Sequence, residues 1–453
     1  VKAIETADFA ALSTSAISAL TTAQTVALTT DQVVALTTGQ AAKLNAESAA
    51  VLSTSQATAL QTADLASLST AAVNALTTAA VSKLSTEQIS NMGTQQIAAL
   101  NLDQVGKLTT DQVVALTTAQ VAAITSDQLA VMTTSQVAAM ETRDVVALTT
   151  SQISKLTEAQ VAAMTTSQVK AITTTALVAM STSQVSAMST DQVNALTTTQ
   201  VANLQTDSLQ ALTTAQAKSL TANQVNALGS NLSKLETADV ANLAANTISG
   251  LSTATVKALT SDQVKALTKT QLQAMTSSQL NALDSGDVTQ MSTDQVAGLK
   301  AEQVGKLSST QLGALTTAQI QSLTNAQVVG LTTTQMGKLG TDQLQALTTS
   351  QVRMLSAAQV NALTTDQVGK LETADVAALS ANAVSGMSTA NVKALTSDQV
   401  KALGKAQLQS LSSGQLNAMD TGDVASMTTD QISNLAANQI GKLATATLNA
   451  MTT

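Results

Sequence analysis

The sequence lacks most of the side chains that enzymes use in catalysis. Its 453 residues include no cysteine, histidine, tyrosine, tryptophan or proline, and Phe9 is the single aromatic residue. The chain therefore has no thiolate, imidazole base or phenol. Serine, threonine, lysine and carboxylates remain, but they recur at the same places along the whole chain and form no isolated constellation. We expect a protein that is not an enzyme, with no catalytic or cofactor-binding residues.

Charge and hydropathy exclude two further classes of protein. The net charge is −8 and only 11% of the residues are charged. Basic patches and stacking aromatics are both missing, which argues against a nucleic-acid partner. No apolar run approaches the ~18 residues of a membrane span. No signal peptide is visible, and a chain that opens on Val1 rather than Met indicates a processed or partial product.

What the chain does contain is an eight-residue unit repeated end to end. Four successive octads from Leu108 read LTTDQVVA, LTTAQVAA, ITSDQLAV and MTTSQVAA. Their first position, here called the lead position, is Leu, Ile or Met in every octad from Ile4 to Leu228 and again from Leu235 to Met451. A second apolar position lies five residues later. We expect residues 1–453 to form one continuous array rather than several ordinary domains.

Two irregularities interrupt this pattern. A seven-residue unit, LGSNLSK, replaces one octad and slips the frame at residues 228–235, which predicts a local kink or phase shift. In addition, residues 234–299 recur in close copy at 370–435. Blocks of several octads have therefore been duplicated within the gene, which is how long arrays grow.

The octad fits a short helix better than it fits one long helix or a β-solenoid. In one long helix, eight residues advance by two turns plus roughly 80°, so the apolar stripe would circle the helix. A β-solenoid fits the many Thr and Val residues. On a strand, however, Val113 and Leu116 would point to opposite faces. On a helix, positions three apart share one face, so both residues would point inward.

Helix-start signals support the short helix. Thr109 and Gln112 match the capping box, in which the hydroxyl accepts from the Gln N–H and the Gln side chain accepts from the Thr N–H. The same box recurs at Thr29/Gln32, Thr133/Gln136, Ser189/Gln192 and Thr396/Gln399. Acids such as Asp111 fall in the first turn and lysines such as Lys107 in the last, as the helix dipole favours.

Such short helices must stack to be stable. A helix of about six residues is marginal alone, because nucleation is costly. We therefore predict an all-α fold, an elongated α-solenoid with one very short helix per octad and its stability in nearest-neighbour interfaces. The β-solenoid is the alternative. Two helices per superhelical turn, or 16 residues, is the simplest expectation for the coil.

Two acidic motifs are the candidate metal ligands. DSGD contains Asp284 and Asp287, and DTGD contains Asp420 and Asp423. Two carboxylates around a glycine could bind Ca²⁺, but Ca²⁺ takes six to eight oxygen ligands. We expect instead that the first Asp is an N-cap and the second replaces the box glutamine, without a metal. ETAD units at Glu236/Asp239 and Glu372/Asp375, and the related ETRD at Glu141/Asp144, are similar box variants with no assigned function.

The threonine doublets are the most regular polar feature. The first Thr of each doublet serves as the cap. The second, as at Thr110, Thr118 and Thr134, is expected to be exposed. A neutral, soluble helix edge explains these residues, and a ladder that binds ice or glycans is the alternative.

Runs such as LTTDQVVALTTAQVAAI resemble the octapeptide repeats of large, repetitive secreted or surface proteins of bacteria, often described as adhesin-like. The resemblance implies an extracellular or cell-surface role and transfers no site residues. The array also shows no polar capping repeats at Val1 or Thr453.

We therefore predict a subunit or segment of an extracellular filament, sheath or surface stalk that assembles end to end, with itself as partner. The alternative is a Thr-rich adhesin that binds ice, glycans or a surface. An intracellular scaffold is least favoured, because its binding groove would need aromatic or charged anchors.

Overall fold

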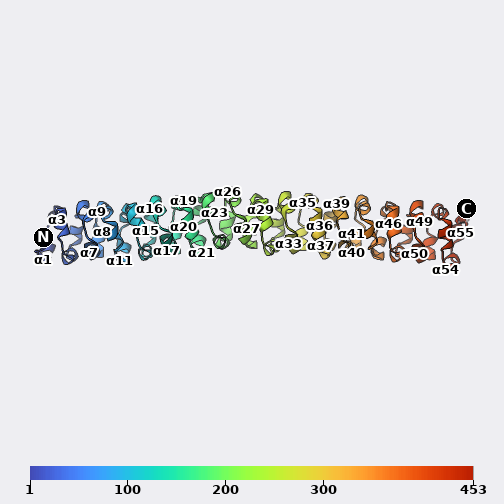
Figure 1. The fold of residues 1–453 in the computed structure, drawn as a ribbon, viewed down its shortest axis with the longest axis horizontal. Helices are drawn as coiled ribbons and strands as arrows, with labels where there is room; N and C mark the ends of the chain where they lie inside the picture. Colours follow the sequence, from blue (N-terminus) through green and yellow to red (C-terminus); the bar gives the residue numbers. More distant parts are fainter. Residues whose placement is uncertain (452–453) are drawn as a thin grey trace. The chain divides into compact units, whose positions relative to one another are not determined.

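The computed structural model describes residues 1–451, and this part of the chain is helical throughout (Figure 1). It contains 55 short α-helices, from α1 (Thr6–Ala10) to α55 (Thr445–Ala450), and one 3₁₀-helix, η1 (Gly229–Lys234). No strand occurs among the described residues. The predicted all-α solenoid is confirmed, and the β-solenoid alternative is wrong.

Each octad folds as one helix followed by an extended link. In α15 (Thr118–Ala123), the N-cap Thr117 has φ −77° and ψ 155°, and the lead residue Ile124 after the helix has φ −57° and ψ 129°. Thr125, the N-cap of the next helix, follows Ile124 directly and is also extended, with φ −71° and ψ 157°. These two residues end one helix and redirect the chain before the next begins.

Successive turns of the coil bring together helices that are three apart in the chain. Thus α6 (Ala46–Ala50) packs on α9 (Thr70–Ala75), and α16 (Ser126–Val131) packs on α19 (Thr150–Lys155). Hydrogen bonds between turns join residues 23 to 31 positions apart. A turn therefore takes between three and four helices, or about 28 residues. The expectation of two helices per turn was wrong, because the backbone angles of the two link residues set the rotation per octad.

The core consists of the apolar side chains that recur in the octads. Val113 and Leu116 are each 1% exposed, which confirms that both point inward from one helix face. The box glutamine joins them, since Gln112 is only 2% exposed. The first two threonines of this octad, Thr109 and Thr110, are exposed.

Charged residues follow the helix dipole as the sequence indicates. Asp111 lies in the first turn of α14 (Thr110–Val114), and Lys155 in the last turn of α19. Other lysines of the same octad position lie at the helix end or just beyond it, as Lys107 does at the C-cap of α13 (Leu102–Gly106). None of the described helices is both long enough and apolar enough to cross a lipid bilayer.

The chain divides into two compact units, Val1–Lys234 and Leu235–Thr453, and the boundary coincides with the frame slip. At the end of the first unit, α28 (Ala222–Leu228) ends at Gly229, which has φ 54° and ψ −124°. The 3₁₀-helix η1 then replaces the usual α-helix, with Leu232 buried. Each unit is a solenoid by itself, and a single continuous array stays a prediction.

Candidate functional site at the interface between turns

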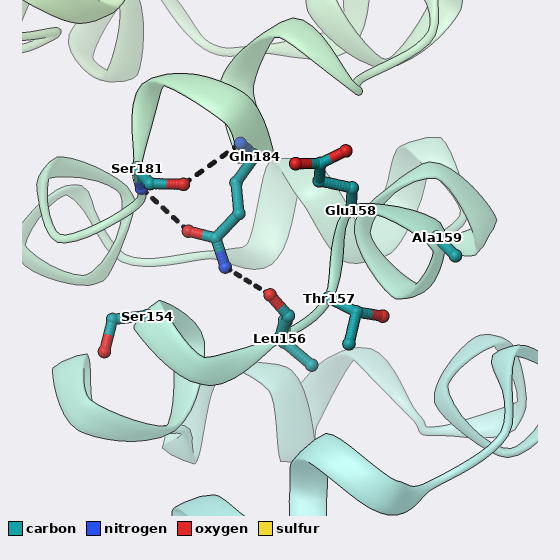
Figure 2. A pocket seen from close by; sticks show the side chains of 7 residues that line it. All are labelled: Ser154, Leu156, Thr157, Glu158, Ala159, Ser181 and Gln184. Carbon is teal, nitrogen blue, oxygen red and sulfur yellow. Dashed lines mark hydrogen bonds between the residues drawn. The ribbon is translucent and has the colours of Figure 1, made fainter.

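The box glutamine first closes the N-terminus of its own helix. In α23 (Thr182–Ser186), the Ser181 N–H donates to Gln184 Oε1 at 2.7 Å, and the Gln184 N–H donates to Ser181 Oγ at 3.1 Å (Figure 2). All five boxes predicted from the sequence have this reciprocal pair, which confirms the helix-start assignment.

The same glutamine also binds the preceding turn. Gln184 Nε2 donates to the carbonyl of Leu156 at 2.6 Å, as Figure 2 shows, and to the carbonyl of Ile153 at 3.0 Å. Ile153 is in the last turn of α19 and Leu156 is its C-cap. Carbonyls at a helix C-terminus lack the usual donor four residues later, and that of Ile153 accepts instead from the Leu156 N–H at 3.2 Å and from Gln184. One amide side chain therefore satisfies the start of one helix and the end of another.

This arrangement recurs along both units. Gln112 donates to the carbonyls 31 and 28 residues earlier at 2.8 Å each. Gln367 does so at 3.1 and 2.7 Å, and Gln439 at 2.9 and 2.6 Å. This second role of the glutamine was not predicted from the sequence. Its signal was the preference for Gln over Glu, because either residue completes a capping box but only the amide has N–H groups to donate.

The turns also approach each other at the backbone. A Cβ added to Gly305 would lie 2.5 Å from the carbonyl oxygen of Gly330 in the next turn. At the corresponding position of another octad, the side chain of Asn281 forms hydrogen bonds with the next turn instead. Its Oδ1 accepts from the Ser308 N–H at 2.7 Å and its Nδ2 donates to the Lys306 carbonyl at 2.9 Å. At this position the main-chain carbonyls of the next turn therefore lie close to the octad.

The candidate metal ligands occupy capping positions. Asp284 is the N-cap of α35 (Ser285–Gln290) and accepts from the Gly286 N–H at 2.9 Å. Asp287, 6% exposed, takes the box position and accepts the Ser261 hydroxyl at 2.6 Å.

The second acidic pair repeats this arrangement. Asp420 accepts from the Gly422 N–H at 3.4 Å, and Asp423 accepts the Ser397 hydroxyl at 2.6 Å. Within residues 1–451, no three carboxylates, histidines or cysteines gather as a metal site would require. The assignment of these four residues to capping rather than to metal binding stays a prediction.

Four further box positions hold a buried aspartate with an unpartnered oxygen. In each of them Oδ2 has no hydrogen-bond partner; the residues are Asp64, Asp144, Asp239 and Asp375. Burial raises the pKa of all four carboxyls. In Asp239 and Asp375 burial, followed by the charge of Glu236 and Glu372 respectively, raises the pKa to about 6.

The second threonine of a doublet is not always exposed. Thr110 and Thr134 are exposed as predicted, but Thr118 is half-buried. Its hydroxyl donates to Asp144 Oδ1 at 2.9 Å. The prediction was wrong at Thr118 because an aspartate stands at the box position of the next turn and accepts the hydroxyl.

Shallow polar hollows lie where two turns meet. One, with a volume of ≈ 430 Å³, is lined by Thr157, Glu158 and Ser181 among others (Figure 2). An equivalent hollow of ≈ 540 Å³ includes Thr316 and Gln343. These hollows present hydroxyl and amide groups that can form hydrogen bonds with a ligand or a surface.

Comparison with known proteins identifies a repeat family. The model of the ALTTAQ repeat matches the chain eleven times and covers more than half of it, at residues 1–38, 57–94, 89–118, 110–141, 137–174, 170–206, 232–269, 272–317, 304–341, 336–371 and 368–405. No curated protein matches the chain.

Proposed function

We propose that the chain, which belongs to the ALTTAQ repeat family, is a non-enzymatic structural protein that assembles end to end into a filament, sheath or surface stalk. The repeat and its solenoid fold are the basis of this proposal. The partner in assembly is a second copy of the same chain.

The observation that supports this proposal most directly is the uniformity of the interface between turns. The same amide donates to the same two carbonyls in octads as distant as those of Gln112 and Gln439. Wherever such an array stops, its outermost turn offers the groups that the next turn would bind. A head-to-tail contact that does not close yields an open fibre.

The side chains fit a structural role better than catalysis. Hydroxyl groups and carboxylates at the recurrent N-cap position are engaged in capping, as at Ser181 and Asp284. Stability held in many equivalent interfaces suits a protein whose task is to span distance.

Assembly can be tested by electron microscopy and light scattering on the purified chain over a range of concentrations. We expect fibres whose proportion rises with concentration and whose helices stack without interruption across chain boundaries. The matched control carries a globular domain fused directly before Val1, which leaves the array unchanged but blocks one end. The fusion should stay monomeric, because its free C-terminal end finds no free N-terminal end to bind. A chain that stays monomeric at every concentration would rule out self-assembly.

We further propose an extracellular or cell-surface location, which rests on the resemblance to repetitive bacterial surface proteins. Antibodies against the array should label intact cells of the source organism. Labelling that requires permeabilised cells would contradict this location.

A Thr-rich binding module is the second candidate, and the recurrent polar hollows favour it. Hydroxyls such as those of Thr157 and Ser181 line these hollows. Glycan arrays and thermal-hysteresis measurements test this function, with exposed threonines such as Thr110 and Thr134 changed to Lys as the control. Binding that persists in the lysine variant would argue against it.

A further inference from the structure

One box aspartate stands where the fold calls for a hydrogen-bond donor. Asp375 is the box residue of α46 (Thr373–Ala378), is 3% exposed, and has no partner for Oδ2. In neighbouring octads this position is a glutamine whose amide donates to the carbonyl 28 residues earlier, as Gln367 does to Leu339 and Gln399 to Leu371. By the same register, the carbonyl facing Asp375 is that of Leu347. An ionised carboxylate has no proton to donate to it.

The chain itself shows that a side chain of this length can reach. Asn391 occupies the box position of α48 (Thr389–Lys393) and has the same heavy-atom shape as a protonated aspartate. Its Nδ2 donates to the carbonyl of Leu363, 28 residues earlier, at 3.0 Å, and to that of Asn361 at 3.3 Å. A proton on Oδ2 of Asp375 would therefore be placed to donate to Leu347 in the same way.

We propose that Asp375 is a proton-binding position, at which mild acidification supplies the hydrogen-bond donor that the box glutamine supplies in other octads. A proton taken from solvent binds Oδ2, and the resulting O–H donates a hydrogen bond to the Leu347 carbonyl. The interface between these two turns consequently becomes more stable as the pH falls.

The charges around Asp375 are compatible with proton uptake. The helices packed on α46 are α43 (Thr349–Val352), followed by Arg353, and α49 (Ser397–Ala402), which contains Asp398 and Lys401. Lys401 pairs with Asp398 at 3.6 Å. The helix that precedes Leu347, α42 (Thr341–Gln345), carries Asp342.

None of these charged groups contributes to the pKa shift of the Asp375 carboxyl. Burial and then Glu372 act on it, and both raise the pKa of Asp375 to about 6.

Two other aspartates at the box position serve for comparison, Asp64 and Asp287. Asp64 resembles Asp375, because it is buried, has an unpartnered Oδ2, and burial raises its pKa. Of the two helices packed on its own helix, α5 (Thr38–Ala41) is followed by Lys43 and α11 (Thr86–Asn91) contains Glu87, and neither charge contributes to that pKa shift. Asp287 differs, because the Ser261 hydroxyl already donates to it. It thus serves as the matched control.

Linkage fixes the direction of the pH effect. A carboxyl whose pKa is about 6 when folded and 3.8 when unfolded binds more protons in the folded state between these values. Its contribution to stability is therefore complete below pH ~4 and is lost as the pH rises through ~6.

The test is the thermal midpoint of the full chain at pH 7.5 and pH 4.5 for three variants: Asp375→Asn, Asp375→Gln and Asp287→Asn. We expect both Asp375 variants to melt roughly 3–6 °C above the unmodified chain at pH 7.5 and within about 2 °C of it at pH 4.5. Asp287→Asn should give no gain at pH 7.5.

Asp375→Gln restores the box of the neighbouring octads, so the test does not depend on Asn alone. Two outcomes would overturn the proposal. In one, both Asp375 variants melt at or below the unmodified chain at pH 7.5. In the other, they gain equally at the two pH values, which would show that the carboxyl binds no proton on folding.

Discussion

At the scale of the residue, the box glutamine connects three main-chain groups. At Gln184, two of them, the N-cap N–H and the lead carbonyl, have no other hydrogen-bond partner among the described residues. In Gln184 the oxygen accepts the N-cap N–H, and the nitrogen donates to two carbonyls of the preceding turn. An unmet buried main-chain group costs about 1–3 kcal/mol, whereas a satisfied hydrogen bond contributes only about 1 kcal/mol. The glutamine therefore matters mostly through the unpaired groups that its loss would create.

We predict that Gln184→Glu lowers the free energy of unfolding by roughly 2–4 kcal/mol at pH 7.5. The carboxylate still completes the box but faces two carbonyl oxygens without a proton. Chemical denaturation should show a smaller loss at pH 4, where protonation restores one donor. The control is Gln95→Glu at an exposed first-turn position, which should be neutral or slightly stabilising. Equal stability of Gln184→Glu and the unmodified chain at pH 7.5 would contradict the role of the amide.

At the scale of the element, a helix of four to seven residues is kept in place by its two ends rather than by its length. A reciprocal cap fixes the start, and the extended lead residue fixes the stop, as in α15 with Thr117 and Ile124. At the frame slip the lead residue Leu228 belongs to α28 itself, so it does not end the helix as an extended residue. After Leu228 the chain turns at Gly229, with φ 54° and ψ −124°, the conformation of the first central residue of a type II′ turn. Only glycine adopts it without strain.

We expect Gly229→Ala to destabilise the first unit by ~2 kcal/mol, although no heavy atom lies within 4 Å of the added Cβ. The cost arises from the backbone angle alone. Gly313→Ala is the control, since it is equally free of neighbours but lies inside α38 (Ser309–Ala314) at an exposed position. It should stabilise by ~0.5–1 kcal/mol. Thermal unfolding of both variants measures these changes in stability. A Gly229→Ala variant as stable as the unmodified chain would show that the turn tolerates a side chain.

At the scale of the molecule, each unit is a series of nearly equivalent interfaces. Each octad lies against octads between three and four places away, because the register between turns is 28 residues rather than a whole number of octads. If one octad is removed, another octad can therefore offer the same contacts to its neighbours. Stability is then the sum of local terms and nearest-neighbour terms.

We predict that deletion of residues 164–171, one complete octad, changes the thermal midpoint by less than about 3 °C. The octads on either side can adopt the same register with new neighbours. Deletion of residues 164–167, half an octad, should lower the midpoint by well over 5 °C, because it breaks the period of lead and box positions. Equal losses in the two deletions would show that the octads are not interchangeable.

Several features of this protein followed from the sequence alone. Reciprocal caps such as Thr109/Gln112, apolar positions three apart, and dipole-matched charges are local properties, and local physics decides them. The octad, its helix and its inward face were therefore predictable.

The number of helices per turn and the second role of the glutamine were not predictable, because they depend on groups 23 to 31 residues away. The rotation per octad comes from two extended link residues whose allowed angles span a wide range. Only tertiary packing selects among those angles, and it thereby decides which carbonyls lie opposite Gln184 and Asp375.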